Sequence, residues 1–240
     1  MPQCKYCQQE KKLIKAHILP RNFYTNYKEK GFWGIEYKKI DKIHFQSGVI
    51  DKNILCKECD NHILGKYDNE AYRILLNIEE TKIKTKWKGL DAYVFDPTEF
   101  NYEYIRKFFI AFLWKASISK LPCMDVVDLG PYEKIALDIL QNKYENENLF
   151  KIIIFKTLND ELKGAHTTRG YKNILGQSRI YSTFFDSYHV SIIVKYKKFP
   201  KEFASLEELF IRKDQIVILE SNIINKFKMD NLLEFKKFLV

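Results

Sequence analysis

Four of the five cysteines fall into two pairs with the same spacing, Cys4 with Cys7 and Cys56 with Cys59. A C-x2-C turn lets two thiolates converge on one ion, and two such turns complete a tetrahedral shell of four sulfurs. A redox dithiol needs only one pair in a βαβ context, and chance seldom pairs four cysteines in this way. The spacing therefore predicts a structural Zn²⁺, because four thiolates leave no coordination position for water.

A histidine and an aspartate next to these pairs could do chemistry. His17 lies in "KAHILPRNFY", and Asp60 directly follows Cys59. Neutral imidazole can take a proton from water, but a histidine can equally pack in the core with its ring bonded to backbone. A carboxylate can bind Mg²⁺ or Mn²⁺, but an acid in the first turn of a helix also stabilises the helix dipole. The residues alone do not decide whether His17 is a base or a core residue, or whether Asp60 binds a cation or stabilises the helix dipole.

A row of lysines is a candidate phosphate-binding surface. In "TKIKTKWKG" every second residue is a lysine, so in a strand the four side chains would share one face. Such a face is either a solvated strand surface or a contact surface for nucleic acid, to which Arg21 beside His17 would add a further cation. The four residues are Lys82, Lys84, Lys86 and Lys88.

The composition sets the class of protein and of partner. The chain has 240 residues, of which 46% are hydrophobic, so it can fill a core. Its formal net charge of +9 favours a polyanionic partner, with DNA expected more than RNA. The N-terminus lacks the apolar region of a signal peptide, and no apolar run reaches the length of a membrane span. We therefore expect a cytoplasmic protein without a membrane partner, in which disulfides are not expected.

The hydrophobic pattern divides the chain into two parts. Residues 1–80 predict a zinc module, with a strand at "AHILP", a long loop or irregular hairpin over residues 21–48, a strand at "GVIDKNIL", and a helix from Lys57. Residues 81–240 predict an α+β domain packed against it, with helices over 101–144, mainly antiparallel strands over 150–222 and a C-terminal helix at "NLLEFKKFL". The predicted class is α+β, with a treble-clef or ββα-metal module, a helical middle and a β-rich end.

The second part contains a predicted buried helix and a predicted polar loop. "YEYIRKFFIAFLWKASISK" reads as the central buried helix, and the charge of Lys115 within it is explained by snorkelling, in which the stem is buried and the amino group reaches water. "KGAHTTRGY" reads as a polar loop that contains His166.

The order of these motifs resembles that of a known family. A first C-x2-C pair, "AHILP", "NILCKEC" and then a helix are similar to the zinc-containing HNH (His-Me finger) endonucleases of the treble-clef type. This likeness covers about residues 4–75. "FLWKAS" at residues 112–117 is in addition similar to a group of uncharacterised bacterial HNH-like proteins.

The resemblance implies a role for individual residues. His17 matches the general base, Asn53 the asparagine that braces the loop, and Asp60 the ligand of a catalytic cation, Mg²⁺ or Mn²⁺. The family usually has an ion-binding residue before the base, where this chain has Ala16. The implied function is metal-dependent hydrolysis of phosphodiester bonds in DNA or RNA, as a bacterial defence or toxin effector. The alternative is a zinc-stabilised module with a decayed site that binds nucleic acid or protein, and either function is compatible with a protein partner or a homo-oligomer.

Overall fold

The computed structural model contains both helices and a large sheet, so the α+β prediction is confirmed. The predicted C-terminal helix at "NLLEFKKFL" falls outside the described residues. The structure describes residues 1–23, 32–36, 41–45, 48–125, 127–157, 165–172 and 179–221, and of these it gives the backbone alone for 32–36, 41–45, 165–172, 202, 203 and 221.

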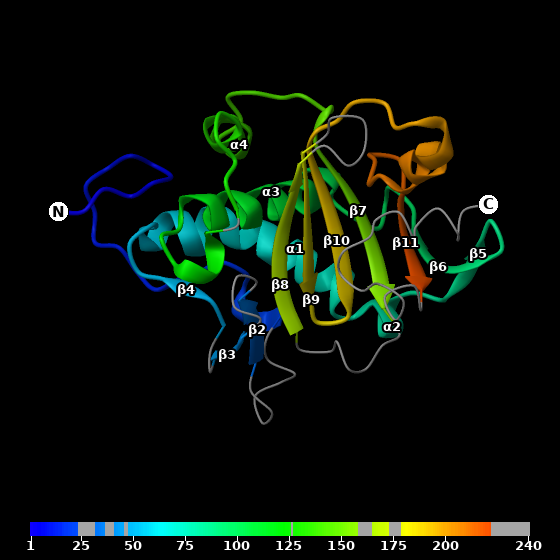
Figure 1. Cartoon of the computed structure of the whole chain (residues 1–240), viewed down its shortest axis with the longest axis horizontal. Coiled ribbons are helices and arrows are strands. Elements are labelled where there is room, and N and C mark those ends of the chain that lie inside the picture. The colour runs from blue at the N-terminus through cyan, green and yellow to red at the C-terminus, as the bar shows by residue number, and fades with distance from the viewer. Residues whose placement is uncertain are drawn as a thin grey trace.

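Nine strands form one sheet with the order β3-β2-β8-β9-β10-β7-β11-β6-β5 (Figure 1). Only the pairs β2–β8 and β7–β11 are parallel within this sheet, so the predicted antiparallel character of the C-terminal strands holds for most pairs. The strands are β2 (Phe32–Glu36), β3 (Asp41–Phe45), β5 (Thr85–Trp87), β6 (Leu90–Phe95), β7 (Leu149–Thr157), β8 (Ala165–Lys172), β9 (Arg179–Phe185), β10 (Tyr188–Lys195) and β11 (Ile216–Ser221).

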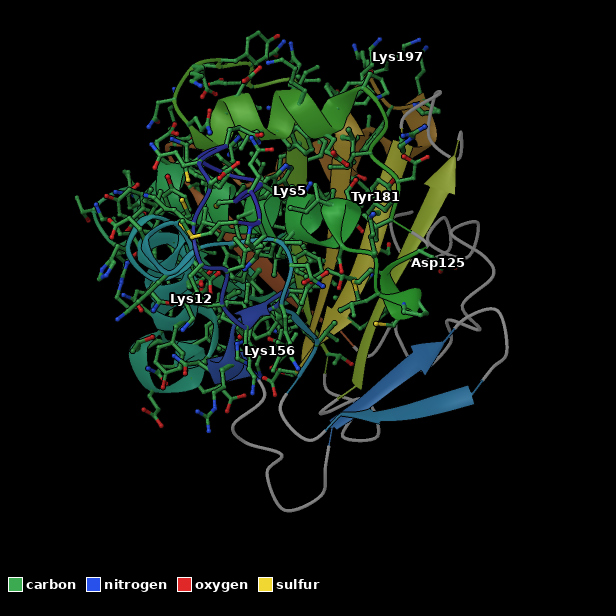
Figure 2. The ribbon with its side chains drawn as sticks, turned by 90° about the vertical axis from the view of Figure 1, so that its left-hand side faces the viewer. Lys5, Lys12, Asp125, Lys156, Tyr181 and Lys197 are labelled. Carbon is green, nitrogen blue, oxygen red and sulfur yellow. The ribbon has the colours of Figure 1, made fainter. Side chains whose placement is uncertain are left out.

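The β8 strand corrects one prediction. The polar loop expected around His166 is a strand, which pairs with β9 from Thr167 opposite Phe184 to Lys172 opposite Arg179. Its sequence is polar, and its backbone pairs with β9, the next strand along the chain, and with β2, which is distant in sequence. The β2–β3 hairpin, predicted as a loop or irregular hairpin, adds to the β8 side of the sheet and projects from the body of the molecule (Figure 2).

Helix α3 (Tyr102–Ile118) is the centre of the molecule, as its sequence predicts. It begins where the Asn101 side chain accepts a hydrogen bond from the Tyr104 backbone N–H at 3.1 Å, an N-cap. All residues over 105–116 are buried. Lys115 is among them with 1% of its surface exposed, so the snorkelling explanation is wrong. Its amino group turns inward because a backbone carbonyl oxygen, that of His17, accepts a hydrogen bond from it at 2.8 Å.

A small two-stranded sheet and a helix follow one another in the N-terminal part. Strands β1 (Ala16–His17) and β4 (Ile50–Asp51) pair antiparallel, and both are shorter than the sequence predicts. The predicted helix from Lys57 is present, but its first part, Glu58–Leu64, is a π-helix. It continues as α1 (Gly65–Leu75), which is followed by the short α2 (Ile78–Thr81).

The helices pack on one face of the nine-stranded sheet (Figure 1). Tyr188 on β10 donates a hydrogen bond to the Leu75 carbonyl oxygen at the end of α1. Tyr181 on β9, labelled in Figure 2, donates one to the Asp128 carbonyl oxygen. A second core cluster fills the other face, under the 3₁₀ helix Lys201–Leu209. The remaining helical segments are Pro122–Met124, a 3₁₀ turn, and α4 (Tyr132–Leu140).

Candidate metal centre and the adjacent charged cluster

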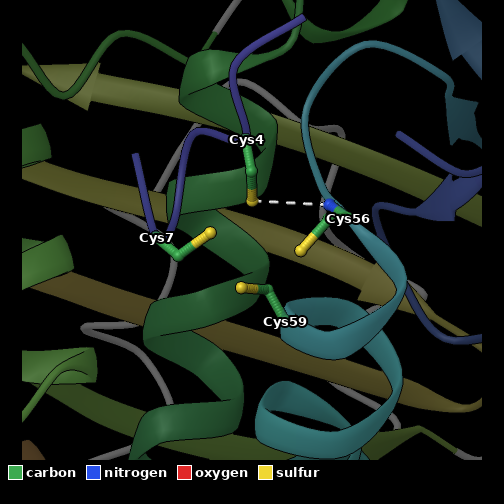
Figure 3. A group of neighbouring side chains, drawn as sticks. All are labelled: Cys4, Cys7, Cys56 and Cys59. Atoms are coloured by element: carbon green, nitrogen blue, oxygen red, sulfur yellow. Dashed lines mark hydrogen bonds between the residues drawn. The ribbon is translucent and has the colours of Figure 1, made fainter. Parts of the chain in front are cut away.

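The four predicted cysteines meet at one point. Their sulfur atoms all lie within 4.8 Å of one another. Cys4 and Cys7 come from an N-terminal turn, whereas Cys56 precedes the π-helix and Cys59 lies within it (Figure 3). Three of the four are buried, and Cys7 is partly exposed. This arrangement could hold one metal ion.

The pKa values of these thiols are shifted by burial, by nearby backbone N–H groups and by one another. Burial acts to raise the pKa of Cys4, but backbone N–H groups of Cys7, Cys56 and Tyr6 lower it to about 7. The donor on Cys56 lies 3.4 Å from the Cys4 sulfur. Burial raises the pKa of Cys59, with the neighbouring thiols adding to the shift. Four thiolates this close need a bound cation to offset their charge.

The first cysteine turn is attached to the helical core. The ring of Tyr6, between Cys4 and Cys7, packs edge-on against Trp114 of α3 with centroids 6.1 Å apart. Its hydroxyl donates to the Leu140 carbonyl oxygen at 3.0 Å, and the Gln141 side-chain amide donates to the Tyr6 carbonyl oxygen. A metal bound here would therefore connect the N-terminal turn, α1 and the α3–α4 pair.

His17 and Asp60 lie beside this centre, in electrostatic range of each other. His17 is partly exposed on β1, and Asp60 is partly exposed in the π-helix. Burial raises the pKa of Asp60, while the charges of Lys115 and of protonated His17 act to lower it. The structure thus places two of the three predicted catalytic residues in one cluster, together with a lysine that sequence reasoning assigned to packing.

Asp68 on α1 is a second carboxylate in this cluster. Burial raises its pKa to about 6, Lys115 acts to lower it, and the charge of Asp60 raises it further. Asp68 is two helical turns after Asp60, and a spacing of eight residues is a signal that the sequence does contain.

Asn53, the third predicted catalytic residue, is exposed in the turn after β4. Its backbone N–H donates to one carboxylate oxygen of Asp51 at 2.8 Å, and the hydroxyl of Ser119 donates to the other at 2.7 Å. Asp51 is buried, so it holds this turn against the end of α3. Sequence reasoning missed both Asp51 and Ser119, because these two residues bond each other from positions far apart in the chain.

The predicted lysine surface lies at the opposite end of the molecule from the N-terminus (Figure 1). Only Lys86 falls within β5, since Lys88 and Gly89 form a two-residue hairpin turn with positive φ angles of 50° and 83°. Arg21 is exposed. Each of the four lysines has an acidic partner: Lys82 with Glu99, Lys84 with Glu220, Lys86 with Asp91, and Lys88 with Glu208. Their charges are thus balanced locally.

Comparison with known proteins identifies no relative of this chain. No protein-family model, no curated protein and no solved structure gives a significant match to the chain. Among the described residues, no helix combines the length and the apolar character that a membrane crossing requires.

Proposed function

We propose that this protein is a zinc-stabilised, metal-dependent endonuclease of the HNH type, which hydrolyses phosphodiester bonds in nucleic acid. The observation that carries the proposal is the arrangement of two antiparallel strands followed by a helix, with His17 on the first strand and Asp60 one residue after the last cysteine of the metal cluster. Both side chains are partly exposed, as groups that act on a substrate must be.

Zinc is the ion that fits the cysteine cluster. A regular tetrahedron with Zn–S bonds of about 2.3 Å has sulfur atoms about 3.8 Å apart. The four sulfurs lie within 4.8 Å of one another, and all four are of the soft thiolate type that Zn²⁺ accepts. With its shell closed by protein, this zinc is structural.

In the proposed reaction, neutral His17 takes the proton of the attacking water. Asp60 would hold the hard cation, Mg²⁺ or Mn²⁺, and Asp68 is the second carboxylate of the cluster. The cation supplies stabilisation of the negative charge that develops on the phosphate and the leaving oxygen. Asp51 keeps the Asn53 turn in place while this happens.

One observation favours a second function, a module that binds nucleic acid or protein without cutting. Ala16 is fully buried opposite Asp51 and offers no ligand where the resembling family binds its ion. Asp51 itself accepts hydrogen bonds through both carboxylate oxygens, so it does not supply the missing ligand. The ion site then rests on the carboxylates of α1 and the π-helix alone.

The two functions are separated by cleavage on one metal-analysed preparation. We expect about one zinc per chain, and cutting of plasmid or single-stranded DNA with Mg²⁺ or Mn²⁺ that is lost in His17→Ala and in Asp60→Asn. His62→Ala is the matched control, because His62 is an exposed histidine on the same helix. RNA substrates test the nucleic-acid class.

Two results would contradict the nuclease. If the wild type binds nucleic acid with any of the cations but never cuts it, the binding function replaces it. Cutting that survives in His17→Ala would indicate a contaminating nuclease. The defence or toxin role is supported by the resemblance alone, and we expect expression in bacteria to be toxic for the wild type but not for His17→Ala.

A further inference from the structure

The last turn of α3 is bonded to both strands of the small sheet. Lys115 donates to the carbonyl oxygen of His17 on β1 at 2.8 Å. One turn later, the Ser119 hydroxyl donates to the carboxylate of Asp51 on β4 at 2.7 Å. The strand that carries His17 has only two residues, and backbone hydrogen bonds from the residues on either side of it also hold it to the chain before and after β4. The contacts from α3 add to these bonds and fix the His17 carbonyl oxygen.

The burial of the Lys115 charge is unfavourable if it serves only to make one hydrogen bond. An ammonium group with 1% of its residue surface exposed loses most of its hydration, and burial of a charge is tolerated only where other charges or dipoles compensate. Two carboxylates lie in electrostatic range, since the charge of Lys115 acts to lower the pKa of both Asp60 and Asp68. A neutral donor such as serine could satisfy a carbonyl oxygen, but it could not offset two carboxylates.

We propose that Lys115 is a positioning residue of the His17 site, whose buried ammonium fixes the His17 backbone against α3 and offsets the negative charge of Asp60 and Asp68. The catalytic part of this inference rests on the proposed nuclease function, whereas the positioning of β1 does not. Lys115 itself does not touch substrate, because its amino group is enclosed.

The test compares Lys115→Met, which keeps the length of the side chain, with Lys115→Arg, which keeps the charge. Lys107→Met is the matched control, because Lys107 is also buried on α3 but donates to Asn142 at 2.6 Å, in the turn after α4. Backbone hydrogen exchange over residues 14–20 is measured beside DNA cleavage and zinc content. Should Lys115→Met not fold, Lys115→Gln, which keeps an N–H donor without charge, takes its place.

We expect Lys115→Met to speed exchange over residues 14–20 by about ten-fold or more and to reduce cleavage by a similar factor, with zinc retained. We expect Lys107→Met to change neither the exchange nor the cleavage. Lys115→Arg should keep cleavage within about three-fold of the wild type. Lys115→Gln should keep much of the exchange protection but cut as poorly as Lys115→Met, since it lacks the charge.

Exchange and cleavage separate the failure of this inference from that of the proposed function. In one outcome, exchange in the tested neutral variant behaves as expected, but neither the wild type nor any variant cuts DNA. The nuclease proposal then fails, and Lys115 remains the residue that fixes β1. If exchange over 14–20 is unchanged in Lys115→Met, the positioning role is wrong. If the wild type cuts DNA and Lys115→Arg is as inactive as Lys115→Met, the charge of Lys115 has no part in cleavage.

Discussion

His189 on β10 should make the stability of the protein fall in mild acid. Its imidazole is buried between the rings of Phe155 and Phe184, whose centroids lie 6.0 and 4.4 Å from its own. Burial lowers the pKa of His189 from 6.5 to about 4. The unfolded chain takes up a proton below about pH 6.5, whereas the folded chain does not until about pH 4, so the folded state loses stability as the pH falls through this window.

The size of the effect follows from the two pKa values. At about pH 5 the linkage amounts to about 2 kcal/mol, and it approaches about 3 kcal/mol below about pH 4. Asp68 acts in the opposite direction, because its pKa is raised to about 6 and protonation therefore favours the folded state below that pH. The contribution of His189 must consequently be isolated by difference.

The assay is urea unfolding at about pH 7.5 and about pH 5, on the wild type and on His189→Gln, which cannot titrate but can still bond the Ser182 hydroxyl that lies 3.3 Å from the histidine ring. We expect the wild type to lose about 2 kcal/mol more than the variant between the two pH values. Metal release and Asp68 act equally on both proteins and cancel. The exposed His62→Gln is the control and should behave as the wild type. A difference below about 0.5 kcal/mol for His189→Gln would refute a buried, neutral imidazole.

Three further changes test the metal centre, the Asn53 turn and the lysines. Cys59→Ser should abolish metal binding and lower the thermal midpoint, whereas Cys123→Ser, outside the cluster, should bind metal as the wild type does in elemental analysis. Asp51→Ala leaves two donors without their acceptor and should cost about 2–4 kcal/mol in urea unfolding; a cost below about 1 kcal/mol would contradict its role. The double change Lys86→Ala with Lys88→Ala removes two exposed ion pairs, so stability should change by less than about 1 kcal/mol and DNA affinity by less than about three-fold in filter binding. A ten-fold loss of affinity would restore β5 as a contact surface.

Local patterns in the sequence predicted the parts of the structure that local chemistry determines. The spacing of Cys4, Cys7, Cys56 and Cys59 requires only two short turns to make a metal cluster, and the structure brings these four sulfurs together. The strongly apolar stretch over 105–116 predicted a buried helix, because its few charged residues do not form a continuous polar face.

Contacts between separate elements of the fold explain what the sequence did not predict. The polar strand β8 forms because β9 and β2 supply hydrogen-bond partners, and nothing in "AHTTRGYK" reports those neighbours. Lys115 likewise is buried because of His17, a residue 98 positions away. The link between Ser119 and Asp51 has the same origin. In each case the partner could be named only once the fold was known.

The path of the chain between β1 and β4 has a consequence for folding. Between these two adjacent strands the chain leaves to form β2 and β3, and β2 pairs with β8 of the large sheet before the chain returns to Cys56. The two halves of the metal cluster are therefore joined by a segment that is itself docked on a strand more than a hundred residues further along. A metal ion that binds the four cysteines would hold both ends of this segment, and its binding free energy would add to the folding free energy. Metal binding should consequently stabilise the β2–β3 edge of the large sheet as well as the two cysteine turns.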